Sequence, residues 1–187
     1  MRRFLFAGMA LIGVAIGVAA YAQNKLEAQT NNSDRNSETW IVVRVQDGDT
    51  LTVGRSGVEE KIRLCGLDAP ELAQPLGEES KQFLEELVNS ADGRVEVVPI
   101  ERDRYDRLVA EVFVLADSGE RSAQTELLSA GMAYVYDRYV DGCENAQPMR
   151  MAQAIAQREK VGVWSSQHVP PWEYRQYPMK LSLDIAA

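Results

Sequence analysis

The sequence predicts an α+β fold, mainly a five-stranded β-barrel packed with three helices, over residues 39–176. Two patterns predict it. Short β-branched runs separated by tight-turn residues occur three times in succession and twice more after an insertion. One segment with apolar residues at helical spacing follows the third of these regions, and two more follow the fifth. A single domain of this length buries a sufficient core without metal or disulfide support.

The first three predicted strands form a meander. Residues 40–46 are apolar and β-branched, and Asp47-Gly48 is a strong hairpin dipeptide. Residues 50–53 continue as the second strand, and a second turn contains Gly57. The third strand is expected over residues 61–67, with Arg63 and Cys65 on one face and Ile62 and Leu64 on the other.

The helices and the last two strands complete the pattern. A helix is expected over residues 78–90, strands over 94–101 and 108–115, and a second helix between Ser122 as N-cap and Gly131. The third helix begins near Pro148 and ends before Gly162. Its expected apolar stripe is formed by Met151, Ala152, Ile155 and Ala156. This order is typical of the OB-fold barrel, an architecture that often binds oligonucleotides.

The chain outside the barrel has three parts. Residues 1–22 predict a signal peptide, because Arg2 and Arg3 precede an uncharged stretch that ends in Ala20-Tyr21-Ala22. The alternative is an uncleaved N-terminal anchor, since the apolar run is long enough to span a bilayer. Residues 23–38 predict a disordered linker, and residues 177–187 form a C-terminal tail without a pattern. The expected localisation is exported, secreted or periplasmic, or membrane-anchored if the signal stays.

The charge of the chain argues against a broad nucleic-acid-binding face. The formal net charge is −8, and removal of Arg2 and Arg3 with the signal brings it to about −10. Proteins that neutralise many phosphates need many basic side chains. Any phosphate binding must therefore come from a few local groups, with or without a metal ion.

Cys65 and Cys143 are the two cysteines of the chain. In an oxidising compartment they can pair. The alternative is two separate buried thiols that act as small apolar side chains.

The candidate chemistry lies in carboxylates and arginines. The single histidine, His168, excludes a catalytic histidine pair and a histidine-rich zinc centre. What remains is Asp49 after the first turn, the pair Asp68 and Glu71 after the third strand, and the basic residues Arg63 and Arg107. Carboxylate oxygens favour hard cations such as calcium or magnesium. Guanidinium groups match phosphoryl oxygens, and a glutamate can deprotonate or orient water.

These residues stand in motifs that resemble those of the thermonuclease, or staphylococcal nuclease-like, family. The resemblance runs from residue 40 to residue 175. Its motifs are Val45-Gln46-Asp47-Gly48-Asp49-Thr50, Ile62-Arg63-Leu64-Cys65-Gly66-Leu67-Asp68-Ala69-Pro70-Glu71, Gln74-Pro75-Leu76-Gly77-Glu78-Glu79-Ser80, Asp103-Arg104-Tyr105-Asp106-Arg107, Gly131-Met132-Ala133-Tyr134-Val135-Tyr136 and Gly162-Val163-Trp164.

The resemblance implies a calcium-dependent phosphodiesterase that cuts DNA and RNA and leaves 3′-phosphates. Asp49, Asp68 and the carbonyl of Ala69 would bind Ca²⁺, and Glu71 would act on the attacking water. Arg63 and Arg107 would bind the scissile phosphate, and Tyr105, Tyr134 and Tyr136 would line the nucleotide site. The family fold would also bring Cys143 near Cys65, which favours a disulfide. The expected partner is a DNA or RNA substrate, and the protein is expected to be a monomer.

The chain departs from the family pattern at three points. Ala69 replaces a common threonine, Asp106 stands where glycine is usual, and the loop after Glu71 is short and lacks lysines. The last two changes affect the expected affinity more than the chemistry. Two other functions stay open: a catalytically inactive OB-fold module that binds nucleic acid, and a cell-surface domain. The complete carboxylate and arginine set favours the enzyme over both.

Overall fold

The computed structural model describes residues 38–117 and 119–176. The predicted signal peptide, the tail and all of the predicted linker except Glu38 lie outside the described residues. Within the described part of the chain, no helix is both long and apolar enough to cross a membrane.

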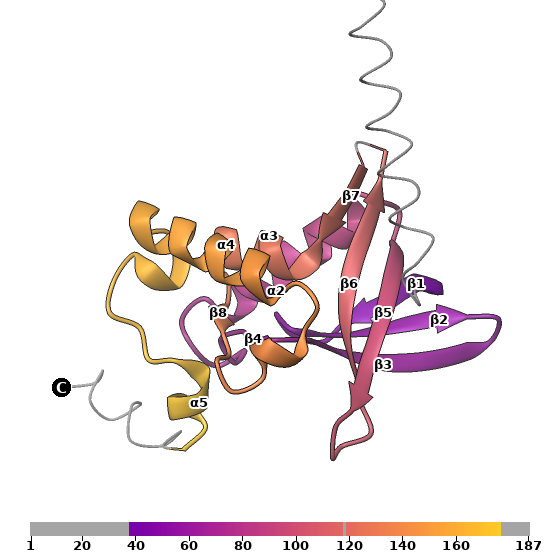
Figure 1. The fold of residues 1–187 in the computed structure, drawn as a ribbon, viewed down its shortest axis with the longest axis horizontal. Coiled ribbons are helices and arrows are strands. Elements are labelled where there is room, and N and C mark those ends of the chain that lie inside the picture. Colours follow the sequence, from indigo (N-terminus) through magenta and orange to yellow (C-terminus); the bar gives the residue numbers. More distant parts are fainter. Residues whose placement is uncertain (1–37, 118, 177–187) are drawn as a thin grey trace, which may run out of the picture. The chain divides into compact units, whose positions relative to one another are not determined.

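A closed five-stranded barrel forms the centre of the fold, which confirms the predicted class (Figure 1). Neighbouring strands are antiparallel in the order β3-β2-β1-β5-β6, and a parallel pairing of β3 with β6 closes the barrel. The β3–β6 contact joins segments more than forty residues apart, so the sequence carries no local signal for this closure. The strands are β1 (Glu38–Val45), β2 (Thr50–Arg55), β3 (Val58–Leu64), β5 (Arg94–Arg102) and β6 (Leu108–Ala116).

The barrel interior is filled by aliphatic side chains that alternate along the strands. Leu51 and Val53 on β2, Ile62 on β3 and Val112 on β6 are fully buried. Burying each such side chain stabilises the fold by about 1.5–3 kcal/mol. A well-packed barrel of this kind gives the loops at its rim a rigid base.

Three helices lie beside the barrel, as predicted, and Figure 1 shows them gathered together. They are α2 (Gly77–Asn89), α3 (Ala123–Ser129) and α4 (Ala146–Glu159). Ser122 caps α3 by accepting a hydrogen bond from the Thr125 amide at 3.3 Å. The predicted stripe of α4 is partly wrong, because Met151 and Ile155 are exposed. Met149, Ala152 and Ala156 form the buried face instead.

Several short elements were not predicted. The strand β7 (Gly119–Ser122) extends the sheet next to β6, and α5 (Pro171–Tyr174) follows the two 3₁₀ turns Val140–Gly142 and Gly162–Trp164. The strand β4 (Leu67–Asp68) pairs with β8 (Tyr134–Val135) in a separate two-stranded sheet. The predicted third strand, 61–67, is therefore two strands, and the break between them shapes the site described next.

Candidate active site

A cavity of about 970 Å³ lies at one rim of the barrel. It is bounded by the β1–β2 turn, the end of β3, the β5–β6 turn, the segment before Gly142 and Arg175. Five acidic residues line it, namely Asp47, Asp49, Glu71, Glu101 and Asp103. Seven basic residues line it as well, namely Lys61, Arg63, Arg102, Arg104, Arg107, Arg138 and Arg175. Basic side chains thus outnumber acidic ones in the cavity although the chain as a whole is acidic. The cavity therefore offers the few local basic groups that phosphate binding would need.

Asp49 is fixed by the hairpin turn between β1 and β2. Its amide donates a hydrogen bond to Asp47 Oδ1 at 3.1 Å, and its carboxylate accepts hydrogen bonds from the Thr50 hydroxyl and the Ala69 amide at 3.0 and 2.9 Å. Gly48 is required here, because a Cβ would lie 2.0 Å from the Ser80 Oγ atom on α2. The turn is therefore packed against the helix, and Asp49 is buried and directed at the cavity rim.

Asp68 and Arg63 meet because the chain turns between them. Gly66 has φ +72, and a Cβ there would lie 2.6 Å from Cys143 Sγ. On one continuous strand, five residues would separate the two Cα atoms by roughly 16 Å. The turn instead allows Arg63 Nη2 to donate to Asp68 Oδ1 at 2.8 Å and to the Leu67 carbonyl at 3.2 Å. The expected unbroken strand over residues 61–67 was wrong, because β3 ends at Leu64 and β4 begins at Leu67.

Arg63 bridges the two predicted metal ligands. Its Nη1 atom forms an ion pair with Asp49, and its Nη2 atom binds Asp68. The side chain is 17% exposed. Burial lowers the pKa of Arg63, Asp68 counteracts this shift, and the positive charge of Arg107 adds to it. An arginine remains ionised throughout, so the group stays a cation between two carboxylates.

Ala69 and Glu71 continue from β4 into the loop that leads to α2. The Ala69 amide donates to Asp49, which places this residue between the two aspartates in the site. The Glu71 amide donates to Gln74 Oε1 at 2.8 Å, and this bond shapes the loop. The Glu71 carboxylate is 40% exposed and borders the cavity. Solvent and substrate can therefore reach it.

Arg107 is held by Asp103 in the β5–β6 turn. Arg107 Nε and Nη2 both lie 2.7 Å from Asp103 Oδ2, and the Arg107 amide donates to Asp103 Oδ1 at 3.0 Å. Burial raises the pKa of Asp103, but the hydrogen bonds from Arg107 and from the Tyr105 amide outweigh it and hold this pKa below its ordinary value. The ionised Asp103 therefore orients the Arg107 fork within the cavity wall.

The backbone at position 106 explains why glycine is usual in the family where this chain has Asp106. Its φ is +63, a left-handed conformation that glycine adopts freely and aspartate tolerates. Its carboxylate is 89% exposed, lies 3.5 Å from Arg102 and does not line the cavity. The extra negative charge is thus turned away from the predicted phosphate site.

The three predicted tyrosines occupy different positions. Tyr105 is exposed at the turn, with the guanidinium groups of Arg104 and Arg107 at 4.7 and 5.7 Å from its ring. Tyr136 also lines the cavity. Tyr134 does not line it, because its ring is buried against Trp164 and Trp172 at 5.1 and 5.5 Å. Burial raises the pKa of Tyr134 to about 12, and Glu173 adds to the shift.

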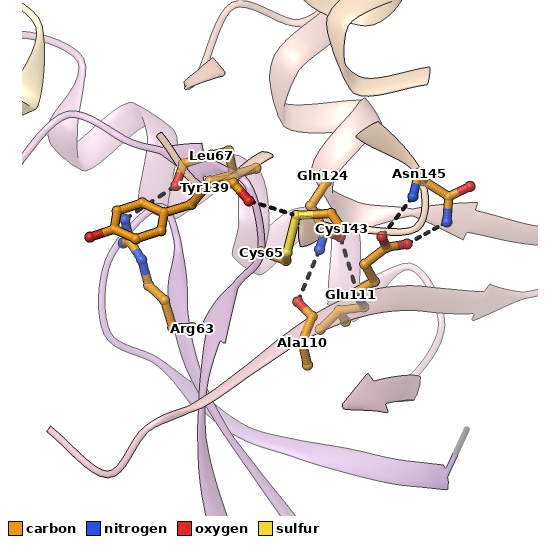
Figure 2. Close-up of a disulfide and its surroundings, with 10 residues drawn as sticks. Arg63, Cys65, Leu67, Ala110, Glu111, Gln124, Tyr139, Cys143 and Asn145 are labelled. Atoms are coloured by element: carbon orange, nitrogen blue, oxygen red, sulfur yellow. Dashed lines mark hydrogen bonds between the residues drawn. A yellow bond between two sulfur atoms is a disulfide. The ribbon is translucent and has the colours of Figure 1, made fainter. Parts of the chain in front are cut away.

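A disulfide joins Cys65 to Cys143 beside the site (Figure 2). It connects the residue after β3 with the segment that contributes Tyr139 and Arg138 to the cavity. Buried Glu111 on β6 holds the segment after Cys143, because its carboxylate accepts hydrogen bonds from the amide and the side chain of Asn145 (Figure 2). The neighbouring Gln124 satisfies the Ala110 carbonyl and the Val112 amide of β6.

The donor set fits a hard divalent cation. Asp49 and Asp68 are 4% and 0% exposed, and their carboxylates converge on one guanidinium, that of Arg63. The oxygens therefore face a common point that favours positive charge, and all of them are ligands that calcium prefers. Within residues 38–117 and 119–176, no group of three or more acidic, histidine or cysteine side chains is arranged to hold a metal ion, so Asp49 and Asp68 are two protein carboxylates only. Backbone oxygen, water or substrate oxygen would have to supply the remaining ligands.

Arg175 is the main site residue that the sequence analysis missed. It lies just after α5, and its Nη atoms bind both oxygens of Asp68 and one oxygen of Glu71. These two carboxylates raise its pKa above the ordinary value, although burial opposes the shift. No local pattern marks it. The one available signal was Trp172 beside Pro170 and Pro171, which indicates an ordered segment rather than a tail.

Comparison with known proteins agrees with this geometry. Residues 61–166 match the family described as staphylococcal nuclease homologue. An uncharacterized endonuclease of Escherichia coli O157:H7 is 39% identical over 72% of this chain and 82% of its own length. A thermonuclease of Staphylococcus hyicus is 29% identical over 82% of this chain and 96% of its own. An uncharacterized endonuclease of Haemophilus influenzae is 32% identical over 76% of this chain and 75% of its own length.

The family match covers more than half of the chain and includes β3, β4, the β5–β6 turn and β8, the elements that build the cavity. Asp49 and Arg175 lie just outside the matched residues, on the two segments that border the same cavity. From its sequence and its site, the chain belongs to the staphylococcal nuclease family.

Proposed function

We propose that this protein is a nuclease that hydrolyses phosphodiester bonds in DNA, RNA or both, with calcium as its metal ion and 3′-phosphate products. The coarser part, a nuclease, follows from the family and from relatives that are named thermonuclease and endonuclease. The observation that carries the proposal is the convergence of Asp49 and buried Asp68 on Arg63, at the wall of a cavity that Asp49, Arg63, Glu71 and Arg107 line.

The chain's own residues supply most of the required chemistry. Arg63 and Arg107 place two guanidinium groups at the cavity, and the N–H groups that the aspartates do not occupy can donate to phosphoryl oxygens as charge builds on them. Glu71, accessible at the cavity edge, accepts a proton from the attacking water. Tyr105 and Tyr136 offer ring faces to the neighbouring bases.

Calcium would be held by the Asp49 and Asp68 carboxylates together with the Ala69 carbonyl. When bound, the ion supplies Lewis-acid polarisation of the phosphate and a fixed position for the attacking water. The arrangement supports this assignment because two buried carboxylates converge on one point and need positive charge beside them, which the Arg63 guanidinium supplies in part and calcium would supplement.

A plasmid-nicking assay tests the metal requirement. We expect cleavage with calcium, loss of cleavage in EGTA and recovery when calcium is added back. A matched variant, Glu71→Gln, should keep only a small residual rate at every calcium concentration while its circular dichroism stays unchanged. Full cleavage by the wild-type protein in EGTA and EDTA would contradict the calcium proposal. Binding of oligonucleotide without any cleavage would favour the inactive binding module instead.

The product chemistry has its own test. A 5′-fluorescent oligonucleotide is cut and then treated with alkaline phosphatase. Loss of a 3′-phosphate lowers the charge of the labelled product, so its gel mobility should fall. Unchanged mobility would show a 3′-hydroxyl end and contradict this part of the proposal.

We also propose that the protein is exported and acts as a monomer. Support for export comes from the pattern of residues 1–22 and from the disulfide, which forms in oxidising compartments. Fractionation of expressing cells, with N-terminal sequencing of the recovered protein, distinguishes cleavage before Gln23 from an uncleaved anchor. Light scattering gives the oligomeric state.

A further inference from the structure

The C-terminal segment brings the Arg175 guanidinium to the cavity, beside two of the predicted site carboxylates. Arg175 lies more than one hundred residues after Asp68 and Glu71, yet it contacts both. Its Nη2 atom binds Asp68 Oδ2 at 2.7 Å, and its Nη1 atom lies 3.1 Å from Asp68 Oδ1 and 2.7 Å from Glu71 Oε1. One planar group therefore ties the two carboxylates together.

Two anchors hold this segment in place. The ring of Trp172 on α5 stacks on Tyr136, with 5.6 Å between centroids and 8° between planes, and meets Tyr134 edge-on. Gln74 donates to the Val169 carbonyl at 3.0 Å while its oxygen accepts from the Glu71 amide. The loop that carries Glu71 is thus fastened to the segment that carries Arg175. This second anchor also explains why buried Gln74 lies in an otherwise exposed turn.

We propose that Arg175 is a positioning residue for the hydrolysis, which fixes the Glu71 carboxylate beside Asp68. The inference rests on the proposed nuclease function. Glu71 is 40% exposed, and within the described residues the Arg175 guanidinium holds its carboxylate at 2.7 Å. Without that partner, a solvent-facing glutamate samples several rotamers, and few of them direct an oxygen at the attacking water. Arg63 cannot replace Arg175, because its two Nη atoms already hold Asp49 and Asp68.

The first test compares Arg175→Ala with the wild type at saturating calcium. We expect kcat to fall roughly 10- to 100-fold, the usual effect of removing a group that orients a site residue, and KM to change by less than about threefold. Arg158→Ala is the matched control, since Arg158 is 74% exposed on α4 and forms an ion pair with the neighbouring Glu159 at 3.4 Å, away from the cavity. It should behave as the wild type.

Calcium binding gives a readout other than activity. The Arg175 guanidinium competes with a cation for Asp68, so isothermal titration calorimetry should show calcium binding to Arg175→Ala at least as tight as to the wild type. A merely structural role would weaken calcium binding, kcat and thermal stability together. Trp172→Ala removes the ring that stacks on Tyr136 and should lower kcat, as Arg175→Ala does.

A double-mutant cycle decides whether Arg175 acts through Glu71. In the Glu71→Gln background, removing Arg175 should change the residual rate by less than about threefold. Unchanged kcat in Arg175→Ala, higher kcat in that variant, or full additivity in the cycle would each overturn the inference and leave the nuclease function standing. An inactive wild-type protein would overturn both.

Discussion

Arg63 and Arg107 hold their positions through different partners, and this difference matters for single substitutions. Arg63 is enclosed by Asp49 and Asp68, whereas Arg107 is oriented by Asp103 in a turn. Both use two nitrogens of one planar fork. A lysine keeps the charge in either position but cannot make two parallel hydrogen bonds.

Arg63→Lys and Arg107→Lys should therefore each lower kcat by roughly 100- to 1,000-fold, the usual effect of losing one donor to transition-state charge. Steady-state rates at saturating calcium measure this effect. Arg158→Lys, on the exposed face of α4, provides the charge-matched control. An Arg107→Lys enzyme with wild-type kcat would show that the β5–β6 turn does not take part in the chemistry.

The break between β3 and β4 is the element on which the site depends most. Gly66 has both a left-handed φ and no room for a side chain, since Cys143 and the Val140 Cα atom lie within 3.1 Å of a Cβ there. Gly57, in the β2–β3 turn, has φ +82 and nothing within 4 Å. The two glycines share the backbone requirement and differ in packing alone.

Gly57→Ala should lower the free energy of unfolding by about 1 kcal/mol, the cost of a left-handed alanine. Gly66→Ala should cost more, about 2–4 kcal/mol, because it adds overpacking against Cys143. It should also lower activity by shifting Asp68 away from Arg63. Denaturant melts of both variants give the comparison, and equal costs would contradict the role of close packing at Gly66.

At this scale, the sequence predicts most of the architecture but not the joints between elements. The strands, the three helices and the Ser122 cap leave local signals in spacing and turn residues. The parallel β3–β6 closure, the β4–β8 pair and the α5 segment depend on contacts between distant residues. For the same reason Asp49, Asp68 and Glu71 were found through motifs, whereas Arg175 was missed. The α4 stripe was misplaced because Met149 and Met151 are both apolar, and only packing decides which one is buried.

At the scale of the whole molecule, an acidic chain surrounds a small basic cavity. Binding of single-stranded nucleic acid should then depend on about two phosphate contacts, at Arg63 and Arg107. Between 50 and 200 mM salt, the affinity of inactive Glu71→Gln for an oligonucleotide should fall only roughly sevenfold. Fluorescence anisotropy measures it. Neutralising exposed Glu78 and Glu79 on α2 changes the net charge but should leave this salt dependence unaltered. A thousandfold loss of oligonucleotide affinity over the same salt range would indicate a broad basic face instead.

The disulfide is the one covalent link between the two halves of the site. In the double variant Cys65→Ser/Cys143→Ser, the free energy of unfolding should be about 2–4 kcal/mol lower, because the closed loop of 78 residues is released. Activity should fall with stability, since the segment that carries Tyr139 loses its tie to β3. Thermal melts with and without a reductant, and mass spectrometry of alkylated protein, provide the measurements. Two freely alkylatable thiols in the exported protein would refute the bridge.

That link also has a consequence for when the enzyme becomes harmful. A chain synthesised among its own cell's chromosome and transcripts, in a compartment that keeps thiols reduced, would lack the bond that fastens its cavity wall. Oxidation after export would complete the wall away from those nucleic acids. The producing cell would then need no separate inhibitor, because the same covalent bond that stabilises the fold would delay cleavage until the protein has left the cytoplasm.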